Sequence, residues 1–168
     1  VSVDDWFRPV NIGFGPDGYL YIADWYNKIV SHNEVPTSHP DRDKKHGRIW
    51  RIRHISQPTR AIVNFYEVPT TQLPAYLKSP YIWEKRAAWN QISERPISET
   101  KLLIPELLSM MFDQTLSTAA RVHVLWSLEN LGFFEDEFIT HGLQDQDDQI
   151  RRETLRYLSG HPDKISRF

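Results

Sequence analysis

The chain has no cysteine among its 168 residues. Disulfide bonds, thiolate metal sites and the C-x-x-C-H attachment of haem are therefore excluded within this sequence. No apolar run approaches the length of a membrane span. Neither sign of charge is in excess, because 20 Lys and Arg oppose 22 Asp and Glu. This balance excludes the strong positive field of a nucleic-acid-binding protein.

Residues 6–55 are predicted to form a sheet of three antiparallel strands. Residues 8–14, 19–24 and 47–54 are rich in β-branched and aromatic side chains, and the last two runs alternate with period two. The sequence G-P-D-G at 15–18 predicts a tight hairpin, since Pro presets φ at a turn and Gly accepts a positive φ. A polar loop at 25–46 joins the second run to the third.

The same region resembles a known family. The strings F-R-P-V, G-P-D-G-Y-L-Y-I-A-D-W-Y-N, S-H-N-E-V-P-T-S-H-P-D-R-D and H-G-R-I-W-R-I look like the last blade of a bacterial β-propeller. They are similar to the large multidomain secreted proteins called membrane-bound dehydrogenases, whose propeller resembles the soluble quinoprotein sugar dehydrogenases. The resemblance covers residues 6–54. It implies HEAT-like helical repeats after the propeller, and often a c-type haem domain.

The resemblance also implies a function for the parent protein. It would oxidise a sugar or polyol with pyrroloquinoline quinone, haem c or both, outside the cytoplasm, in the periplasm or after secretion. The sequence begins at Val1 without Met or a signal peptide, so we expect an excised segment. One blade cannot close a propeller, so the segment itself is expected to be structural, inactive and free of cofactor. Its expected partners are the other blades and further repeats. The alternative is a non-catalytic propeller and solenoid scaffold that binds protein or glycan.

From residue 70 onward the period becomes helical. We therefore expect an α+β protein with a blade-like sheet at 1–69 and a HEAT- or armadillo-like array at 70–168. Helices are expected at 81–94, 98–112, 118–131, 135–143 and 148–159, with the regular part of the second starting near Pro105. Ser117 and Asp147 are expected N-caps, and Gly132 is an expected C-terminal stop. A short strand is expected at 61–66.

A repeat supports the helical array. Three basic residues, Lys85, Arg121 and Arg151, are each followed four and seven positions later by apolar residues. The spacings of 36 and 30 residues are near the unit length of helical-pair solenoids. His123 and Trp126 fall in the expected helix 118–131 and are interpreted as core. The last helix has no following repeat, so we expect part of its surface to be exposed.

The loop at 31–46 holds weak candidates for a metal site, His32, His39, Asp41 and Asp43. Imidazole and carboxylate groups are suitable ligands for divalent ions. None of the spacings matches a metal signature, so we favour a polar loop fixed by its own hydrogen bonds and by ion pairs within Asp41-Arg42-Asp43. His32 is also a weak candidate for a general base.

The ends of the first two runs hold the cofactor candidates, Arg8, Asp24 and Trp25. A guanidinium at Arg8 could clamp a carboxylate or a quinone oxygen, or take part in catalysis. Its structural alternative is an ion pair with Asp24 that locks the strand ends. Asp24 could accept calcium or turn hydrogen bonds, and Trp25 could stack on a sugar or pack between blades. We favour the structural alternative for each of these residues.

Overall fold

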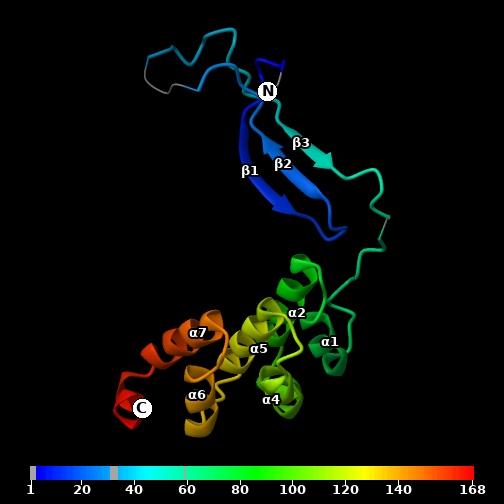
Figure 1. The fold of residues 1–168 in the computed structure, drawn as a ribbon. Coiled ribbons are helices and arrows are strands. Elements are labelled where there is room, and N and C mark those ends of the chain that lie inside the picture. The colour runs from blue at the N-terminus through cyan, green and yellow to red at the C-terminus, as the bar shows by residue number, and fades with distance from the viewer. Residues whose placement is uncertain (1–2, 31–33, 59) are drawn as a thin grey trace. The chain divides into compact units, whose positions relative to one another are not determined.

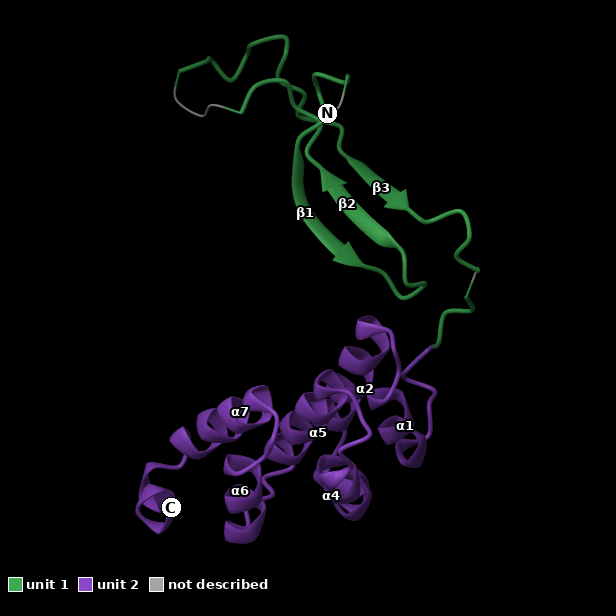
Figure 2. Cartoon of the chain, in the orientation of Figure 1, with its two compact units in different colours: residues 1–63 green, residues 64–168 purple. Residues whose placement is uncertain are grey.

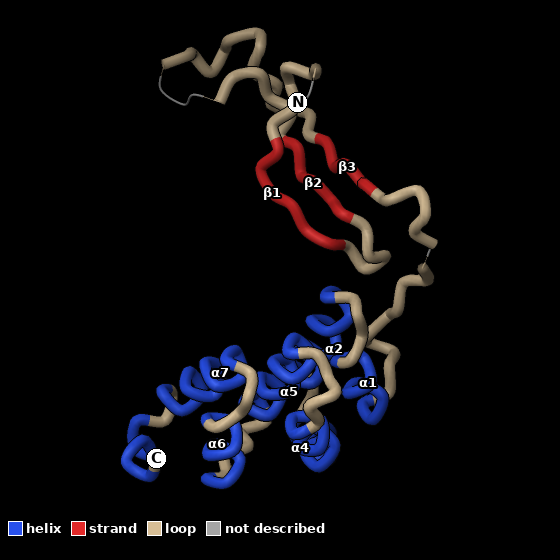
Figure 3. The backbone as a smooth tube through the Cα atoms, in the orientation of Figure 1, coloured by secondary structure: helices blue, strands red, loops and turns tan. Residues whose placement is uncertain are grey.

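The computed structural model describes residues 3–30, 34–58 and 60–168 (Figure 1). The chain divides into two compact units, residues 1–63 and 64–168 (Figure 2). The boundary follows Val63, a few residues before the expected one at Pro69. All strands of the described residues lie in the first unit and all α-helices in the second (Figure 3). The protein is therefore an α+β protein, as the sequence predicts.

The first unit is an antiparallel sheet in the order β1 (Pro9–Phe14), β2 (Leu20–Asp24), β3 (Arg48–Ile52). The predicted hairpin joins β1 to β2, with the N–H of Gly18 donating to the carbonyl of Gly15 at 2.9 Å. Gly18 has a φ of 77°. A Cβ at Gly15 would lie 2.3 Å from the Tyr21 ring, so any other residue there would force that ring to move.

The second unit, which the structure describes completely, contains seven α-helices. Their bounds are α1 Leu73–Leu77, α2 Ile82–Glu94, α3 Ile97–Thr100, α4 Ile104–Phe112, α5 Thr118–Asn130, α6 Asp136–Leu143 and α7 Asp148–Ser159. Helices α1 and α2, α4 and α5, and α6 and α7 pack as pairs, and α5 contacts both α2 and α7 (Figure 2). The predicted caps are confirmed, since Ser117 and Asp147 accept backbone N–H groups and Gly132 has a φ of 69°. Within this chain, no helix of the described residues is both long and apolar enough to cross a membrane.

The repeated basic residues have a common structural role. Lys85 donates to the carbonyl of Ser79, Arg121 to that of Met111 at 2.8 Å, and Arg151 to that of Asp145 at 2.7 Å. Each cation lies in the second helix of a pair. It binds a carbonyl in the last turn of the first helix or in the loop that follows. Carbonyls there lack partners within their own helix, so the cation completes their hydrogen bonding. The repeat is thus a device that joins the two helices of each pair.

The structure differs from the prediction at residues 61–66 and agrees with it at Pro105. The strand at 61–66 is wrong, because Asn64 to Glu67 form a turn, in which the N–H of Glu67 donates to the carbonyl of Asn64 at 3.1 Å. Phe65 is buried there in the helical unit, with its ring 4.8 Å from that of Tyr76. The break at Pro105 is confirmed, since α3 and a 3-10 turn at Lys101–Leu103 precede α4.

Candidate functional site

The carboxylate of Asp24 is the centre of the polar cluster at one end of the sheet. Its side chain is buried at the end of β2. Oδ1 accepts the backbone N–H groups of Arg8 at 2.8 Å and Tyr26 at 2.9 Å. Oδ2 accepts the Nε–H of Arg48 at 3.0 Å and the indole N–H of Trp50 at 2.9 Å. Four donors therefore surround this one carboxylate, and the cluster that they form is called the Asp24 clasp below.

The pKa of Asp24 is lowered to about 2. Burial by itself raises this pKa, because it removes water from the charged form. The hydrogen bonds from Arg8, Trp50 and Tyr26, together with the charge of Arg48, outweigh burial. The carboxylate is consequently ionised at neutral pH and has its oxygens occupied, which suits a structural anion better than a proton-transfer group.

Arg48 is a partner of Asp24 that was not predicted from the sequence. Its guanidinium reaches Asp24 and also donates to Asp4 Oδ2 at 2.7 Å. It lies over the ring of Tyr26, 3.9 Å from the centroid, and 5.1 Å from that of Trp50. Tyr26 adopts a left-handed φ of 52°, which turns the chain directly after β2. Asp24 and Arg48 are opposite each other in β2 and β3. Their contact could have been predicted only from the register of these two strands.

The expected ion pair between Arg8 and Asp24 is wrong. Only the backbone N–H of Arg8 binds Asp24. The guanidinium donates instead to the carbonyls of Phe7 at 2.8 Å and Lys28 at 3.2 Å. It therefore ties the start of β1 to the segment after β2. Arg48 takes the carboxylate because its position is directly opposite Asp24 in the sheet.

The described part of the loop, residues 34–46, is held by its own polar groups. Asp43 Oδ1 accepts the N–H groups of Lys45 at 2.8 Å and His46 at 3.1 Å, and its Oδ2 lies 2.7 Å from His46 Nδ1. These bonds lower the pKa of Asp43, and the hydrogen bond from the Lys45 N–H has the largest effect. The carbonyl of Asp43 accepts a hydrogen bond from Asn27 at 3.3 Å, which links the loop to the chain after β2.

The residues of Asp41-Arg42-Asp43 do not form the expected ion pairs with one another, but bind other groups. Asp43 pairs with His46, and Arg42 donates to the carbonyl of Val35 at 2.9 Å. His39 Nδ1 accepts the N–H of Asp41 at 3.2 Å. His32 lies outside the described residues. Among the residues that are described, no group of three His, Asp or Glu side chains could hold a metal ion.

The cofactor candidates Arg8, Asp24 and Trp25 each contact groups of this chain. The oxygens of Asp24 and the guanidinium of Arg8 are engaged with this chain's own groups. Trp25 is 36% exposed and its backbone N–H donates to the carbonyl of Arg8 at 2.9 Å. With no cysteine, the chain also cannot attach haem c. The geometry at this end of the sheet is that of a structural clasp.

One family model matches the chain. It is described as a domain of unknown function, DUF7133, and it covers residues 1–56. No curated protein and no solved structure matches. The matched region holds the three strands, the loop and the Asp24 clasp, and it ends shortly after β3. The helical unit lies outside the match.

Proposed function

We propose that this chain is a structural segment, in which the sheet serves as one blade of a larger, propeller-type β-structure. The observation that carries the proposal is apolar exposure on both faces of the sheet. Ile12 (67%) and Ile52 (48%) are exposed on one face, and Ile49 (75%) on the other. A sheet buries an apolar face only by packing it against another layer, and these side chains have no such layer over them. In a propeller each blade packs against a neighbour on both faces, which would cover these side chains.

The parent protein is a further part of the proposal. By the resemblance of residues 6–54, it is a secreted or periplasmic bacterial protein that oxidises a sugar or polyol with a quinone. The alternative is a non-catalytic scaffold for protein or glycan. The local engagement of Arg8 and Asp24 supports the scaffold, because both side chains bind groups of this chain. Either parent leaves this segment without a complete active site.

Self-association of the whole chain tests the blade assignment. The exposed faces and the open edges of β1 and β3 should make the chain associate with itself at high concentration. Light scattering after size exclusion should show this. The combined variant Ile12→Thr, Phe14→Thr and Ile52→Thr should associate more weakly than the wild type, since Thr keeps β propensity and removes the apolar area of one face, while Ile49 and the strand edges remain.

The matched control places the changes on the helical unit. Ile97, Leu102 and Leu155 are 54%, 55% and 59% exposed. Their combined replacement with Gln should leave association unchanged. A wild-type chain that stays monomeric at every concentration would contradict the proposal, as would association in the sheet variant that is as strong as in the wild type.

A variant of the full-length parent distinguishes the enzyme from the scaffold. If Arg8 clamps a quinone there, Arg8→Gln should abolish the quinone absorbance of the purified protein. If Arg8 only ties β1 to the segment after β2, the absorbance should be unchanged and the melting temperature should fall.

A further inference from the structure

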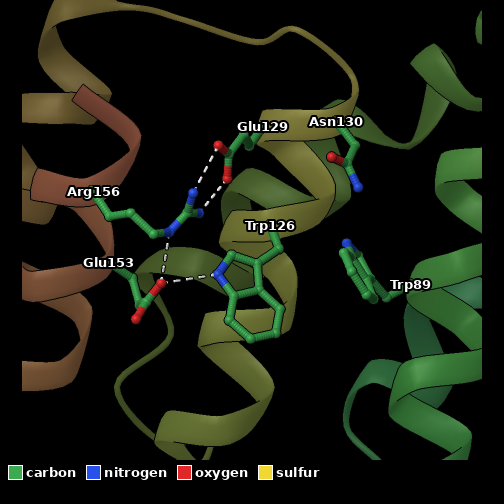
Figure 4. Close-up of a pocket in the computed structure, with 6 residues that line it drawn as sticks. All are labelled: Trp89, Trp126, Glu129, Asn130, Glu153 and Arg156. Carbon is green, nitrogen blue, oxygen red and sulfur yellow. Dashed lines mark hydrogen bonds and ion pairs between the residues drawn. The ribbon is translucent and has the colours of Figure 1, made fainter. Parts of the chain in front are cut away.

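One face of the helical unit carries a groove that none of the candidates above includes (Figure 4). Its volume is about 360 Å³. This lies in the range of about 300–1,000 Å³ that is usual for small-molecule sites. Three neighbouring helices line it, with Trp89 from α2, Trp126, Glu129 and Asn130 from α5, and Glu153 and Arg156 from α7.

Two indole rings form the apolar part of the groove. The centroids of Trp89 and Trp126 are 5.5 Å apart, and the ring planes are inclined by 54°. Both side chains are partly exposed. The interpretation of Trp126 as a core residue is therefore only partly correct. Large aromatic faces next to solvent offer flat apolar area to a ligand at little cost in conformational entropy.

The polar part of the groove is electrically compensated. Arg156 donates to both oxygens of Glu129, one at 3.0 Å, and to Glu153 at 2.9 Å. Glu153 also accepts the indole N–H of Trp126 at 3.1 Å. Burial raises the pKa of Glu153, but the bonds from Arg156 and Trp126 lower it overall. Both carboxylates and the guanidinium of Arg156 are thus fixed in orientation (Figure 4). A second cation, Arg152, lies 3.3 Å from the other oxygen of Glu153, so two cations balance the two carboxylates.

Trp89 leaves one donor without a partner. Its indole Nε1 is buried and has no hydrogen-bond acceptor among the described residues. In Figure 4 this nitrogen lies at the end of the ring nearest Asn130, whose side chain is exposed. A buried polar group without a partner is rare and needs an explanation. A ligand hydroxyl that displaces the exposed Asn130 side chain would reach this nitrogen and supply the acceptor.

We propose that this groove binds a pyranose ring of a neutral glycan. A pyranose presents an apolar C–H face, which can lie on an indole, and hydroxyls, which both donate and accept. The donor without a partner here is Trp89 Nε1. The Asn130 amide nitrogen donates one hydrogen to Ser93 Oγ and has a second hydrogen for a ligand, and the acceptors are the oriented carboxylates. A cationic ligand would compete with Arg156 for its carboxylates, and an anionic ligand would find no free cation, because Arg156 is engaged.

The test is titration of the whole chain with cellohexaose, xylohexaose, maltohexaose and chitohexaose by calorimetry and saturation-transfer NMR. At least one should bind saturably. Trp126→Ala should weaken it by about tenfold or more through loss of an aromatic face. Trp25→Ala, which removes an exposed Trp from the other unit, should leave the affinity unchanged.

Trp89→Phe is the decisive variant, because it keeps an aromatic wall and removes a donor that has no protein partner. The fold should be intact by circular dichroism and the affinity several-fold lower. The proposal is overturned if no oligosaccharide saturates, or if affinity is unchanged in Trp89→Phe. Saturable binding of tetramethylammonium or of an acidic peptide in place of the sugars would also overturn it. None of these results bears on the blade assignment.

Discussion

Arg48 Nε lies 3.0 Å from Asp24 Oδ2, and the two residues are direct partners across β2 and β3. The contact joins the third strand, which follows a long loop, to the hairpin that precedes it. The same guanidinium reaches Asp4 at 2.7 Å, before β1. One arginine therefore connects the lead-in, the central strand and the last strand. This connection predicts that the clasp, and not the hairpin alone, determines the stability of the sheet.

Asp24→Asn should destabilise the sheet by roughly 2–4 kcal/mol, because it weakens a charged, buried acceptor with four donors. The folded pKa of about 2 is below the unfolded value, so ionised Asp24 stabilises the fold at neutral pH. This stabilisation is present above about pH 4 and is lost as the pH falls toward 2. Amide exchange of Ile22 and Trp50 as a function of pH should show the loss in the wild type and little of it in the variant.

Asp5→Asn is the matched control for this acid dependence, since Asp5 is exposed in the same unit. It should leave the exchange rates and their pH profile unchanged. An Asp24→Asn chain with wild-type exchange at neutral pH would refute the clasp.

Asp43→Ala should lower the melting temperature of the sheet by a few degrees, because the N–H groups of Lys45 and His46 lose their acceptor. Asp41→Ala is the comparison, since only the backbone N–H of Asp41 makes a described hydrogen bond, and its effect should be smaller. Chelator should alter neither melting curve. Equal melting of wild type and Asp43→Ala, with a loss of metal or cofactor binding in the parent, would support a site in place of a clasp.

Much of the fold could be predicted because local chemistry determines it. The turn at Gly15 to Gly18 needs glycine, Ser117 and Asp147 cap helices with their own side chains, and Pro105 starts a helix. The prediction of a strand at 61–66 was wrong because the composition is strand-like, whereas Phe65 is buried in the helical unit. Tertiary burial thus overrode local propensity.

The clasp could be predicted only in part. The sequence singled out Asp24, but it assigned the wrong arginine, since the choice between Arg8 and Arg48 depends on strand register. The groove on the helices was missed for a similar reason. Trp89, Trp126 and Arg156 lie in three separate helices, and only the packing of α5 against α2 and α7 brings them together.

Arg121 and Asp145 form the buried ion pair of the helical unit. Their side chains are 2% and 0% exposed, and Arg121 Nη1 donates to Asp145 Oδ1 at 3.1 Å. Burial raises the pKa of Asp145, but the bonds from Arg121, the backbone of Asp147 and Gln114 lower it to about 2. Asp145→Ala leaves a buried guanidinium without its counter-ion, so urea unfolding followed by helix ellipticity should show a loss of about 3–5 kcal/mol.

Arg167→Ala provides the control for this prediction. Arg167 and Asp136 also form an ion pair, at 3.1 Å, but both side chains are more than half exposed. Solvent screens such a pair, so its removal should cost less than about 1 kcal/mol. If burial determines the difference, the double variant Arg121→Met with Asp145→Leu should recover part of the stability lost in Asp145→Ala, because it removes the unpaired charge. Equal losses in Asp145→Ala and Arg167→Ala would show instead that the buried pair contributes no more than a surface contact.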